Sequence, residues 1–353
     1  MSMKLLGLGT ALPPARATTA QAALLAGVLG GYDAELVRLA SVLYRRSGVE
    51  GRHTVLDVGT GAPLRPVEPG GEPPRTSERM SAYDPAAAEL AGRAARAALA
   101  DAGLPPERIT HLVTVSCTGA AAPGVDIALL RALPLRPDCQ RTHVGFMGCH
   151  GALAGLRVAR AFAEADPRAV VLLVAVELCS LHFHYGRGEG QVTANALFAD
   201  GAAALVGAAG EGPGWSLAGS GSCLLPEGED AMSWTIGDHG FRMTLSPRVP
   251  EIVARHLPGW LAAWLDAQGL AQSDVRSWAV HPGGPRVLTV VGEALGLPAS
   301  ATEVSRAVLA EHGNMSSPTV LFVLQRLRAA DAPRPACALS FGPGLVVEAA
   351  LWR

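Results

Sequence analysis

The segment HVGFMGCHGALAGLRVARAF, residues 143–162, joins a short strand-like run to an alanine-rich helix through two glycines and one cysteine. Apolar side chains such as Leu153 and Leu156 recur at helical spacing after the turn. Cys149 is therefore expected at a helix N-terminus, where unpaired amides and the helix dipole favour a thiolate and lower its pKa. A small buried cysteine with a packing role fits this segment equally well.

A second segment repeats this arrangement. GNMSSPTVLFVLQRLRAADAPR, residues 313–334, also runs from a turn into a helix and then through Ala-Asp towards a strand. Cys149 aligns with Asn314 at an offset of 165 residues, and Gly103 aligns with Gly269 at an offset of 166. Two matches at nearly one offset indicate a duplicated unit. If the two copies pack around a pseudo-two-fold axis, Cys149 and Asn314 face one cavity.

The composition is typical of a globular α/β protein. The 353 residues are 49% hydrophobic and 17% charged, with a formal net charge of −2. This length suits two units of about 150–200 residues, and we predict an N-terminal half over residues 1–210 and a C-terminal half over residues 211–353. Buried strand-like runs alternate with amphipathic helices, which indicates sheets covered on both faces. The balanced charge argues against bulk attraction to nucleic acid or to an anionic membrane.

The cysteines and the N-terminus indicate a cytoplasmic protein. None of the six cysteines forms a C-x-x-C pair, so we expect reduced thiols and no metal site. The first residues, MSMKLLGLGTALPP, make a poor signal peptide. The longest apolar strand-like run, residues 169–176, is far too short to cross a membrane, so no membrane insertion is expected.

A nucleophilic cysteine needs a base or a cation beside it. His281, in SWAVHPGGPRVL, comes directly after an apolar strand, and such strand ends face ligands in α/β folds. A single histidine is more often structural. Asn314 precedes a helix whose first turn contains Pro318, so its ordinary role would be that of a cap. Its equivalence with Cys149 in the repeat favours a functional role.

Several motifs together resemble the type III polyketide synthases, the chalcone-synthase-like group of the thiolase superfamily. In chain order they are LGLGTALPP, GFMGCHGALAGLRVA, NALFADGAAALVG, WAVHPGGPRVL, EHGNMSSPTVLFVL and LSFGPGLVVEAA. The HPGGP motif differs from the H-Q-x-N pattern that is usual in ketoacyl synthase III enzymes. The resemblance implies an αβαβα thiolase-like fold, a homodimer, and no cofactor beyond the CoA thioester substrates.

The resemblance also implies roles for the three candidate residues. Cys149 would accept the acyl group as a thioester, and His281 would hold Cys149 as a thiolate in an ion pair. His281 and Asn314 would then hydrogen-bond the thioester carbonyl of malonyl-CoA and stabilise the enolate that decarboxylation forms.

Further positions match the cavity and the CoA site of that family. Phe198 matches one gatekeeper phenylalanine, whereas Met243 stands where the second is expected and Trp234 where plant enzymes have glycine. The full set of implied cavity residues is Cys117, Cys179, His182, Phe198, Trp234, Met243 and Ser316. For the CoA phosphates the best match is Arg46, with Arg45 and Arg52 as less secure ones; a solvated helix end explains each equally well.

We therefore expect an acyltransferase that loads an acyl-CoA starter, extends it with malonyl-CoA and cyclises the product to a pyrone or a resorcinol-type ring. Small residues at positions 120–122 suggest a fatty acyl starter. Within the fold, the alternatives are a malonyl-only synthase of the tetrahydroxynaphthalene type and a one-step β-ketoacyl synthase. Outside it, they are a cysteine hydrolase and a non-catalytic acyl-binding scaffold.

Overall fold

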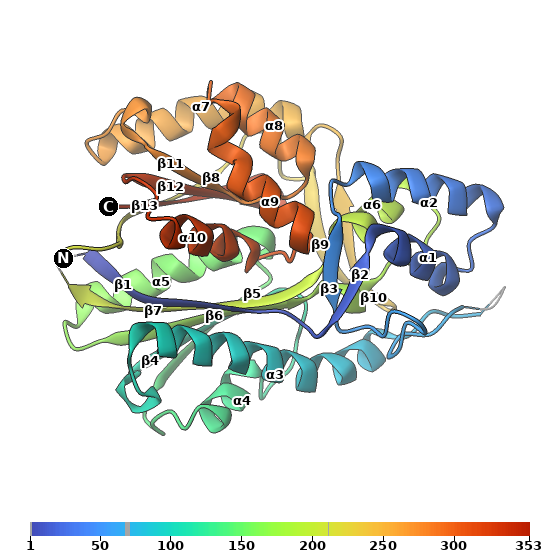
Figure 1. The fold of residues 1–353 in the computed structure, drawn as a ribbon, viewed down its shortest axis with the longest axis horizontal. Coiled ribbons are helices and arrows are strands. Elements are labelled where there is room, and N and C mark those ends of the chain that lie inside the picture. Colours follow the sequence, from blue (N-terminus) through green and yellow to red (C-terminus); the bar gives the residue numbers. More distant parts are fainter. Residues whose placement is uncertain (1, 68–70, 211) are drawn as a thin grey trace.

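The computed structural model describes residues 2–67, 71–210 and 212–353 and shows layers of helix and sheet in the order αβαβα (Figure 1). In this part of the chain nine strands form one hydrogen-bonded sheet, in the order β11-β12-β13-β8-β1-β7-β6-β4-β5. The N-terminal half supplies β1 (Ser2–Ala11), β4 (His111–Ser116), β5 (Gln140–Gly145), β6 (Val170–Leu178) and β7 (Asp200–Gly210). The C-terminal half supplies β8 (Ser216–Leu224), β11 (Ser277–Val280), β12 (Ala336–Gly342) and β13 (Val346–Trp352).

The two halves of the sheet meet only where β1 pairs with β8, at Met3 with Leu217 and Lys4 with Ser216. Between them lie α5 (Gly151–Ala165) and α10 (Thr319–Ala329). One outer layer holds α3 (Thr76–Ala102) and α4 (Val125–Ala132). The opposite one holds α7 (Val249–Ala267) and α8 (Pro285–Ala294), with α9 (Glu303–His312) beside α10.

The duplication predicted from the sequence is visible in equivalent elements. In the N-terminal half, α3 is followed by a short 3₁₀ turn at Pro106–Arg108 and by β4; in the C-terminal half, α7 is followed by a turn at Gln272–Asp274 and by β11. The central helices α5 and α10 carry the two segments that align in the sequence. The αβαβα expectation is confirmed. The predicted change from one half to the other at residues 210/211 falls between β7 and β8, and residue 211 itself lies outside the described residues.

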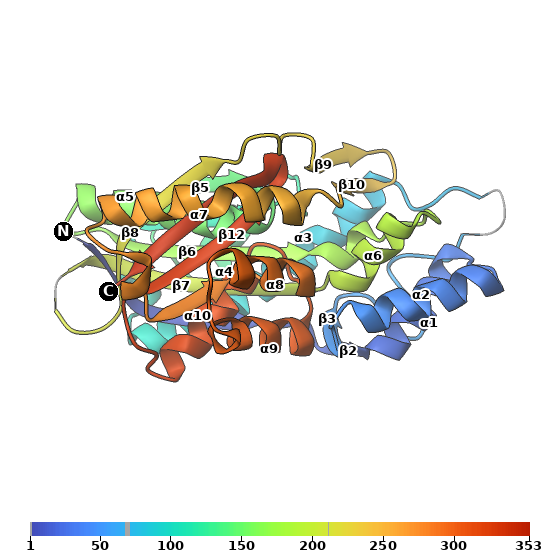
Figure 2. The same cartoon turned by 90° about the horizontal axis from the view of Figure 1, so that it is seen from above.

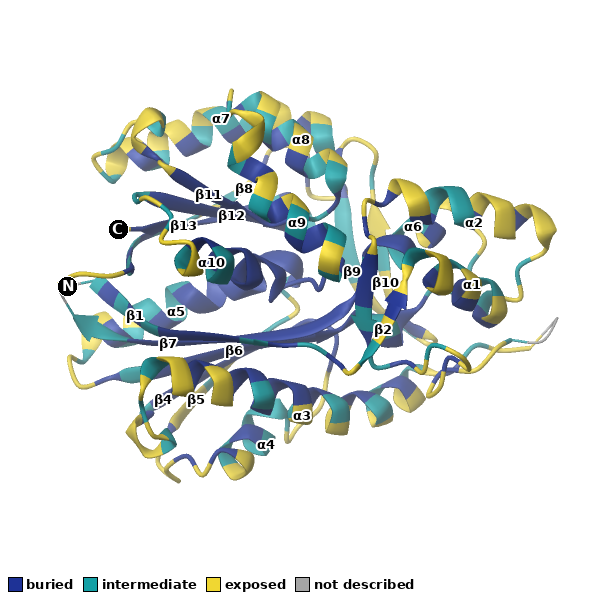
Figure 3. Cartoon of the chain, in the orientation of Figure 1, coloured by how far each residue is buried: buried dark blue, intermediate teal, exposed yellow. Residues whose placement is uncertain are grey.

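A third group of elements forms the end of the molecule opposite the two termini (Figure 2). It contains three helices and two small two-stranded sheets: α1 (Thr19–Gly30), α2 (Ala34–Arg46), α6 (Glu189–Leu197), β2 (Ala15–Thr18) with β3 (Gly51–Thr54), and the hairpin of β9 (Met232–Gly237) with β10 (Gly240–Leu245). Burial follows the layers, because the strands of the main sheet and the helices between its halves are the most buried elements (Figure 3).

Helix α3 begins at Thr76, well before Pro85, although a proline is common in the first turn of a helix. Pro85 looks like a helix start but lies inside the helix. The extra turns are held by Arg79, which is 1% exposed and donates hydrogen bonds to the carbonyls of Pro74, Leu181 and Phe183.

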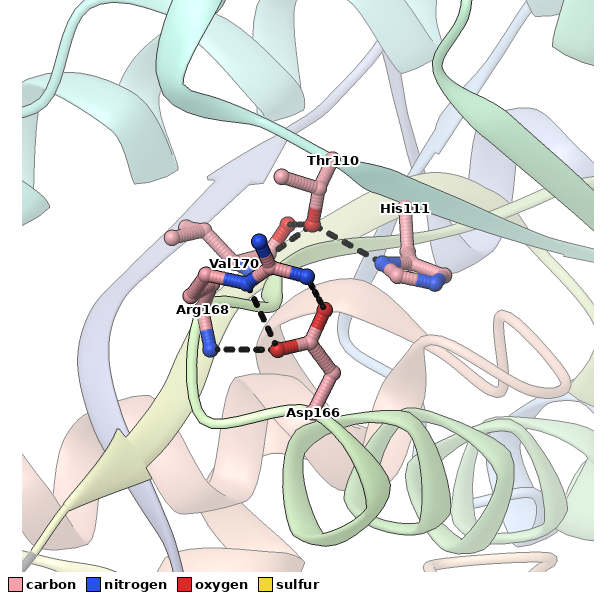
Figure 4. Close-up of polar contacts among 5 residues, drawn as sticks. All are labelled: Thr110, His111, Asp166, Arg168 and Val170. Atoms are coloured by element: carbon pink, nitrogen blue, oxygen red, sulfur yellow. Dashed lines mark hydrogen bonds and ion pairs between the residues drawn. The ribbon is translucent and has the colours of Figure 1, made fainter.

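The parallel strands β4, β5 and β6 all start at one edge of the sheet, which Figure 4 shows in close-up. There the Thr110 hydroxyl accepts a hydrogen bond from the Val170 amide at 2.9 Å and lies 2.8 Å from Nδ1 of His111. Asp166 pairs with Arg168 at the same edge. Because these strands are parallel, their carboxyl ends meet at the opposite edge, where ligands bind in α/β folds.

Among the described residues, none of the helices combines the length and apolar character that a membrane span requires.

Candidate active site

A largely apolar cavity opens at the carboxyl ends of β4 and β6 and continues beneath α1. Near the strand ends it is lined by Cys117, Thr118, Cys149, Cys179, His182, Phe198, Trp234, Met243, Ser316 and Pro343. Beneath the helices it is lined by Ala17, Ala22, Leu25, Ala26, Leu29, Tyr44, Leu56 and Phe183, among others. The structure therefore brings to one cavity every predicted cavity residue and the predicted nucleophile, from six separate segments of the chain.

Cys149 lies in a 3₁₀ turn, Gly148–His150, that leads directly into α5. Gly148 has a φ of 66°, and a Cβ at this position would lie 2.4 Å from the Cδ of Pro343. Only glycine fits here, because the turn needs both the left-handed conformation and the close approach of residues 342–344. This close packing sets Cys149 at the cavity wall, where it is 8% exposed.

Burial raises the pKa of the Cys149 thiol to about 11. Hydrogen bonds with Ser316 and Asn314 lower this pKa, and the charge of Glu177 raises it. The sequence-based expectation of a lowered pKa at a helix N-terminus was wrong, because the loss of solvation outweighs these hydrogen bonds.

His281 follows β11, and its amide donates to the carbonyl of Leu339 on the parallel strand β12 at 2.7 Å. The next residue on β12, Ser340, donates from its hydroxyl to the carbonyl of Cys149 at 2.8 Å. His281 and the Cys149 turn are therefore bonded to consecutive residues of β12. The His281 ring is 1% exposed, neither ring nitrogen has a hydrogen-bond partner in the described structure, and burial lowers its pKa to about 3.

Asn314 is held by its backbone between the other segments of the site. Its amide donates to Leu197 and its carbonyl accepts from Ala199, both at 2.9 Å. Its side-chain oxygen accepts from the amide of Ser316 at 2.8 Å, and Nδ2 donates to the carbonyl of Gly283 at a long 3.4 Å. Helix α10 begins five residues later, with Pro318 as its cap, so Asn314 does not cap it. The weak bond to Gly283 leaves the amide able to donate elsewhere.

Ser316 connects two of the cavity thiols. Its hydroxyl lies 3.5 Å from the sulfur of Cys117 and also hydrogen-bonds Cys149. Ser316 has a φ of 56°, a conformation that is strained for a residue with a side chain and that is often found at functional sites. Burial raises the pKa of Cys117 and Cys179 well above the usual value, so these thiols remain protonated.

The β9–β10 hairpin closes one side of the cavity. Trp234 and Met243 face each other across this hairpin, and the indole of Trp234 donates to the carbonyl of Cys117 at 2.7 Å. His182 stacks on Phe241 with ring centroids 4.2 Å apart. The amide of Phe241 donates to Nδ1 of His182, and Nε2 donates to the carbonyl of Thr118 at 2.7 Å. Both nitrogens are thus used by the neutral ring, and burial lowers the pKa of His182 to about 3.

Phe198 is half-buried at the cavity wall, directly after α6 and bridged to Asn314. Arg52 departs from its predicted role. Its guanidinium is buried and donates to the carbonyls of Asn195, Ala196 and Phe198 at the end of α6. A buried guanidinium that is bonded to three carbonyls holds this helix end in place, so we correct the expectation that Arg52 binds CoA phosphates.

Arg45 and Arg46 lie in the last turn of α2 with exposed side chains. This placement fits both a phosphate site and a simple complement to the helix dipole. Within the described ranges, no group of three or more His, Cys, Asp or Glu residues is arranged to hold a metal ion.

Sequence reasoning missed Glu177, which lies on β6 and is fully buried behind the cavity wall. Its carboxylate accepts from the amides of Cys117 and Thr118 at 3.0 Å and from the Ser317 hydroxyl at 2.7 Å. Burial raises the pKa of Glu177, and these hydrogen bonds lower it. One signal was available, because Glu177 interrupts the otherwise apolar run AVVLLVAVEL. A buried charge in such a run needs partners and so indicates a polar network.

The geometry thus offers a cavity thiol, a buried imidazole with free nitrogens, and an amide donor, all at strand or turn ends. A thiol can accept an acyl group, and the two nitrogen donors can stabilise negative charge on a thioester oxygen. The apolar continuation beneath α1 offers space for a hydrocarbon chain.

Comparison with known proteins agrees with this geometry. The family described as "Chalcone and stilbene synthases, N-terminal domain" matches residues 4–211, and the corresponding C-terminal domain matches residues 216–353. A 1,3,6,8-tetrahydroxynaphthalene synthase from Streptomyces peucetius subsp. caesius is 36% identical, covering 98% of this chain and 91% of that protein. The "Alpha-pyrone synthesis polyketide synthase-like Pks18" of Mycobacterium tuberculosis is 34% identical, covering 80% of this chain and 74% of that protein.

Solved structures show the same likeness. The crystal structure of PKS-I from the brown alga Ectocarpus siliculosus superposes with a TM-score of 0.92 at 30% identity. The superposition covers 100% of this chain and 98% of the algal one.

Proposed function

The chain belongs to the chalcone and stilbene synthase family and is thus a type III polyketide synthase, a condensing acyltransferase. We propose that it extends a fatty acyl-CoA starter with malonyl-CoA and cyclises the product to a pyrone or a resorcinol-type ring. The observation that supports this starter is the apolar arm of the cavity beneath α1. Leu25, Leu29 and Leu56 line that arm, and the one charged side chain among the lining residues, Arg52, has its guanidinium bonded to three backbone carbonyls.

The cycle begins when the Cys149 thiolate attacks the thioester carbonyl of the starter. The carbon–sulfur bond to CoA breaks, the acyl group stays on Cys149, and CoA leaves as a thiolate. The pKa values of Cys149 and His281 each disfavour the charged form in isolation. The thiolate and the imidazolium must therefore form together, by transfer of the thiol proton to His281, so that each charge stabilises the other.

Extension needs no general base. Malonyl-CoA loses CO₂, and the electron pair of the broken carbon–carbon bond becomes an enolate whose oxygen accepts from His281 and from Nδ2 of Asn314. The enolate carbon attacks the acyl carbonyl on Cys149, and the Cys149 thiolate leaves. No proton is consumed in this step, so the ion pair is restored for the next one.

A malonyl-only synthase is the second candidate, and one observation favours it. The relative that matches 98% of this chain is a 1,3,6,8-tetrahydroxynaphthalene synthase. A malonyl-derived starter leaves the apolar arm unused, which is why we place the fatty acyl starter first.

One assay tests both candidate functions, the fatty acyl starter and the malonyl-only synthase. The purified protein is incubated with malonyl-CoA and a series of acyl-CoA starters of increasing length, and products are identified by mass spectrometry. Pyrones or resorcinols that carry the alkyl chain support the proposal. A naphthalene product from malonyl-CoA alone supports the second candidate, and acyl hydrolysis without extension contradicts both.

A further inference from the structure

Helix α1 lies at the surface, and beyond its first turn, which contains Thr19 and the exposed Gln21, all of its residues are apolar. Its sequence, TAQAALLAGVLG, contains no charged residue. Ala22, Leu25, Ala26 and Leu29 face inwards and line the cavity. Outwards, the side chain of Leu24 is 69% exposed and that of Val28 is 48% exposed. A helix at a water-exposed surface normally has a polar outer face, so an apolar one indicates a further contact.

The exposed side chains form one patch. Leu24 and Val28 are one helical turn apart on the same face of α1. Val37 of α2 is 40% exposed, and its Cγ2 lies only 3.5 Å from where a Cβ on Gly27 would be. The three side chains therefore adjoin at the far end of the molecule, where α1 and α2 project from the layered body (Figures 1 and 2). We call Leu24, Val28 and Val37 the outer patch.

Exposed charges of both signs lie on and beside α2, with arginines in the majority. Arg38 is exposed in the middle of this helix and Arg45 and Arg46 in its last turn, whereas Glu35 is its one acidic residue and the exposed N-cap Asp33 is paired with Arg187. An apolar helix face next to a group of arginines is typical of segments that lie in the headgroup region of an anionic bilayer. The net charge of −2 for the whole chain does not oppose this, because salt screens charges more than about 10 Å away.

From these observations we propose that the outer patch docks on an anionic lipid surface, with α1 lying in the interface and the arginines of α2 at the headgroups. Only α1 then separates the lipid from the apolar arm of the cavity. The docking is inferred from the outer patch and the arginines of α2 alone. Docking would let the protein take a long, poorly soluble acyl starter from the lipid, and this role rests on the proposed function.

Vesicle flotation tests the docking without any measurement of activity. We expect the full-length protein to float with vesicles of roughly equal parts phosphatidylglycerol and phosphatidylcholine, and much less with phosphatidylcholine alone. The double variant Leu24→Glu/Val28→Glu should lower the vesicle-bound fraction about tenfold, because two carboxylates replace the inserted side chains. The matched control is Ile236→Glu, which changes a 57% exposed apolar side chain on β9 and should bind like the wild type.

Three results would overturn the proposal. The first is a wild-type protein that does not float with anionic vesicles, and the second is equal flotation of the double variant. The third is a double variant whose mass by light scattering falls relative to the wild type, since the outer patch would then be an interface between copies of this chain.

A second measurement separates the docking from the proposed function. With a short, soluble starter the double variant should match the wild type, since Leu24 and Val28 do not line the cavity. With a long-chain starter held in anionic vesicles its rate should fall about tenfold, in line with binding. If no long-chain starter is extended by the wild type while docking persists, the proposed starter fails and the docking stands. Equal rates for both proteins in vesicles would contradict the delivery role.

Discussion

At Cys149 two electrostatic effects oppose each other. The turn into α5 provides amide groups that would favour a thiolate, but burial raises the thiol pKa to about 11. Burial also lowers the pKa of His281, so each side chain alone favours its neutral form. The proposed mechanism therefore requires a proton transfer from Cys149 to His281.

The pH dependence of alkylation tests this coupling. If the ion pair forms, iodoacetamide should modify Cys149 at a rate that is nearly constant from about pH 6 to 9. In His281→Ala the raised thiol pKa alone controls reactivity, so the rate should rise about tenfold per pH unit up to about pH 10. Peptide mass spectrometry measures the modification, with Cys223 as the internal reference. Identical profiles for both proteins would contradict the pairing.

Removal of the nucleophile separates the two chemical steps. Cys149→Ala should abolish chain extension, whereas Cys149→Gln should still decarboxylate malonyl-CoA, because His281 and Asn314 remain to stabilise the enolate. Acetyl-CoA formation is followed by chromatography. Adding Asn314→Ala to Cys149→Gln should lower decarboxylation by about 100-fold, as is usual for the loss of one such donor. Substantial extension by Cys149→Ala would disprove the nucleophile assignment.

At the scale of elements, α1 covers one arm of the cavity. Its inner residues line the arm, so a large side chain there should shorten it. We expect Ala26→Trp to shift the preferred starter to shorter acyl chains while malonyl-CoA decarboxylation stays unchanged. Ala20→Trp, at an exposed position of the same helix, is the control. Product profiles across a starter series measure the shift, and an unchanged preference in Ala26→Trp would place the acyl chain elsewhere.

At the scale of the whole molecule, the halves share one core. Residues from both pack around α5 and α10, including Leu153, Leu156, Val320 and Phe322. We expect residues 1–210 expressed alone to lack a cooperative thermal transition, because the inner face of α5 would be exposed to water. Co-expression with residues 211–353 should restore the transition. Differential scanning calorimetry checks this, and a stable isolated half would contradict it. The homodimer that the family resemblance implies stays a prediction.

Buried neutral histidines should also make the whole molecule sensitive to acid. Burial lowers the pKa of His182 to about 3 and that of His150 to about 4. The unfolded chain takes up protons below about pH 6.5 while these folded rings do not, so stability falls with decreasing pH over that window. Each ring contributes up to about 1.4 kcal/mol per pH unit. Asp200, whose pKa is raised to about 6, acts in the opposite direction.

Calorimetry between about pH 7 and 5 should therefore show a falling unfolding temperature. The fall should be shallower in His182→Gln, which removes one of the rings. A midpoint that is independent of pH over this range would contradict the neutral state of these rings.

The sequence was sufficient for features set by local pattern and by repetition. Helical spacing placed α5 and α10 after the turns of Cys149 and Asn314, the apolar run at residues 169–176 overlaps β6, and the family resemblance implied the layered αβαβα arrangement. Local pattern is not sufficient at α3, where Pro85 resembles a helix start, because contacts of the buried Arg79 with distant segments hold the earlier turns. It missed Glu177 and misassigned Arg52, since the partners of both come from distant segments.

What the chain alone determined, then, is the order of elements and the residue types at strand ends, because hydrophobic periodicity and turn chemistry act over a few neighbouring residues. Only the tertiary structure decided that β12 bonds His281 through Leu339 and the Cys149 turn through Ser340, that desolvation outweighs the helix terminus at the thiol, and that the cavity extends beneath α1. Burial, charge and cavity shape depend on which distant segments are packed together, and no local pattern contains that information.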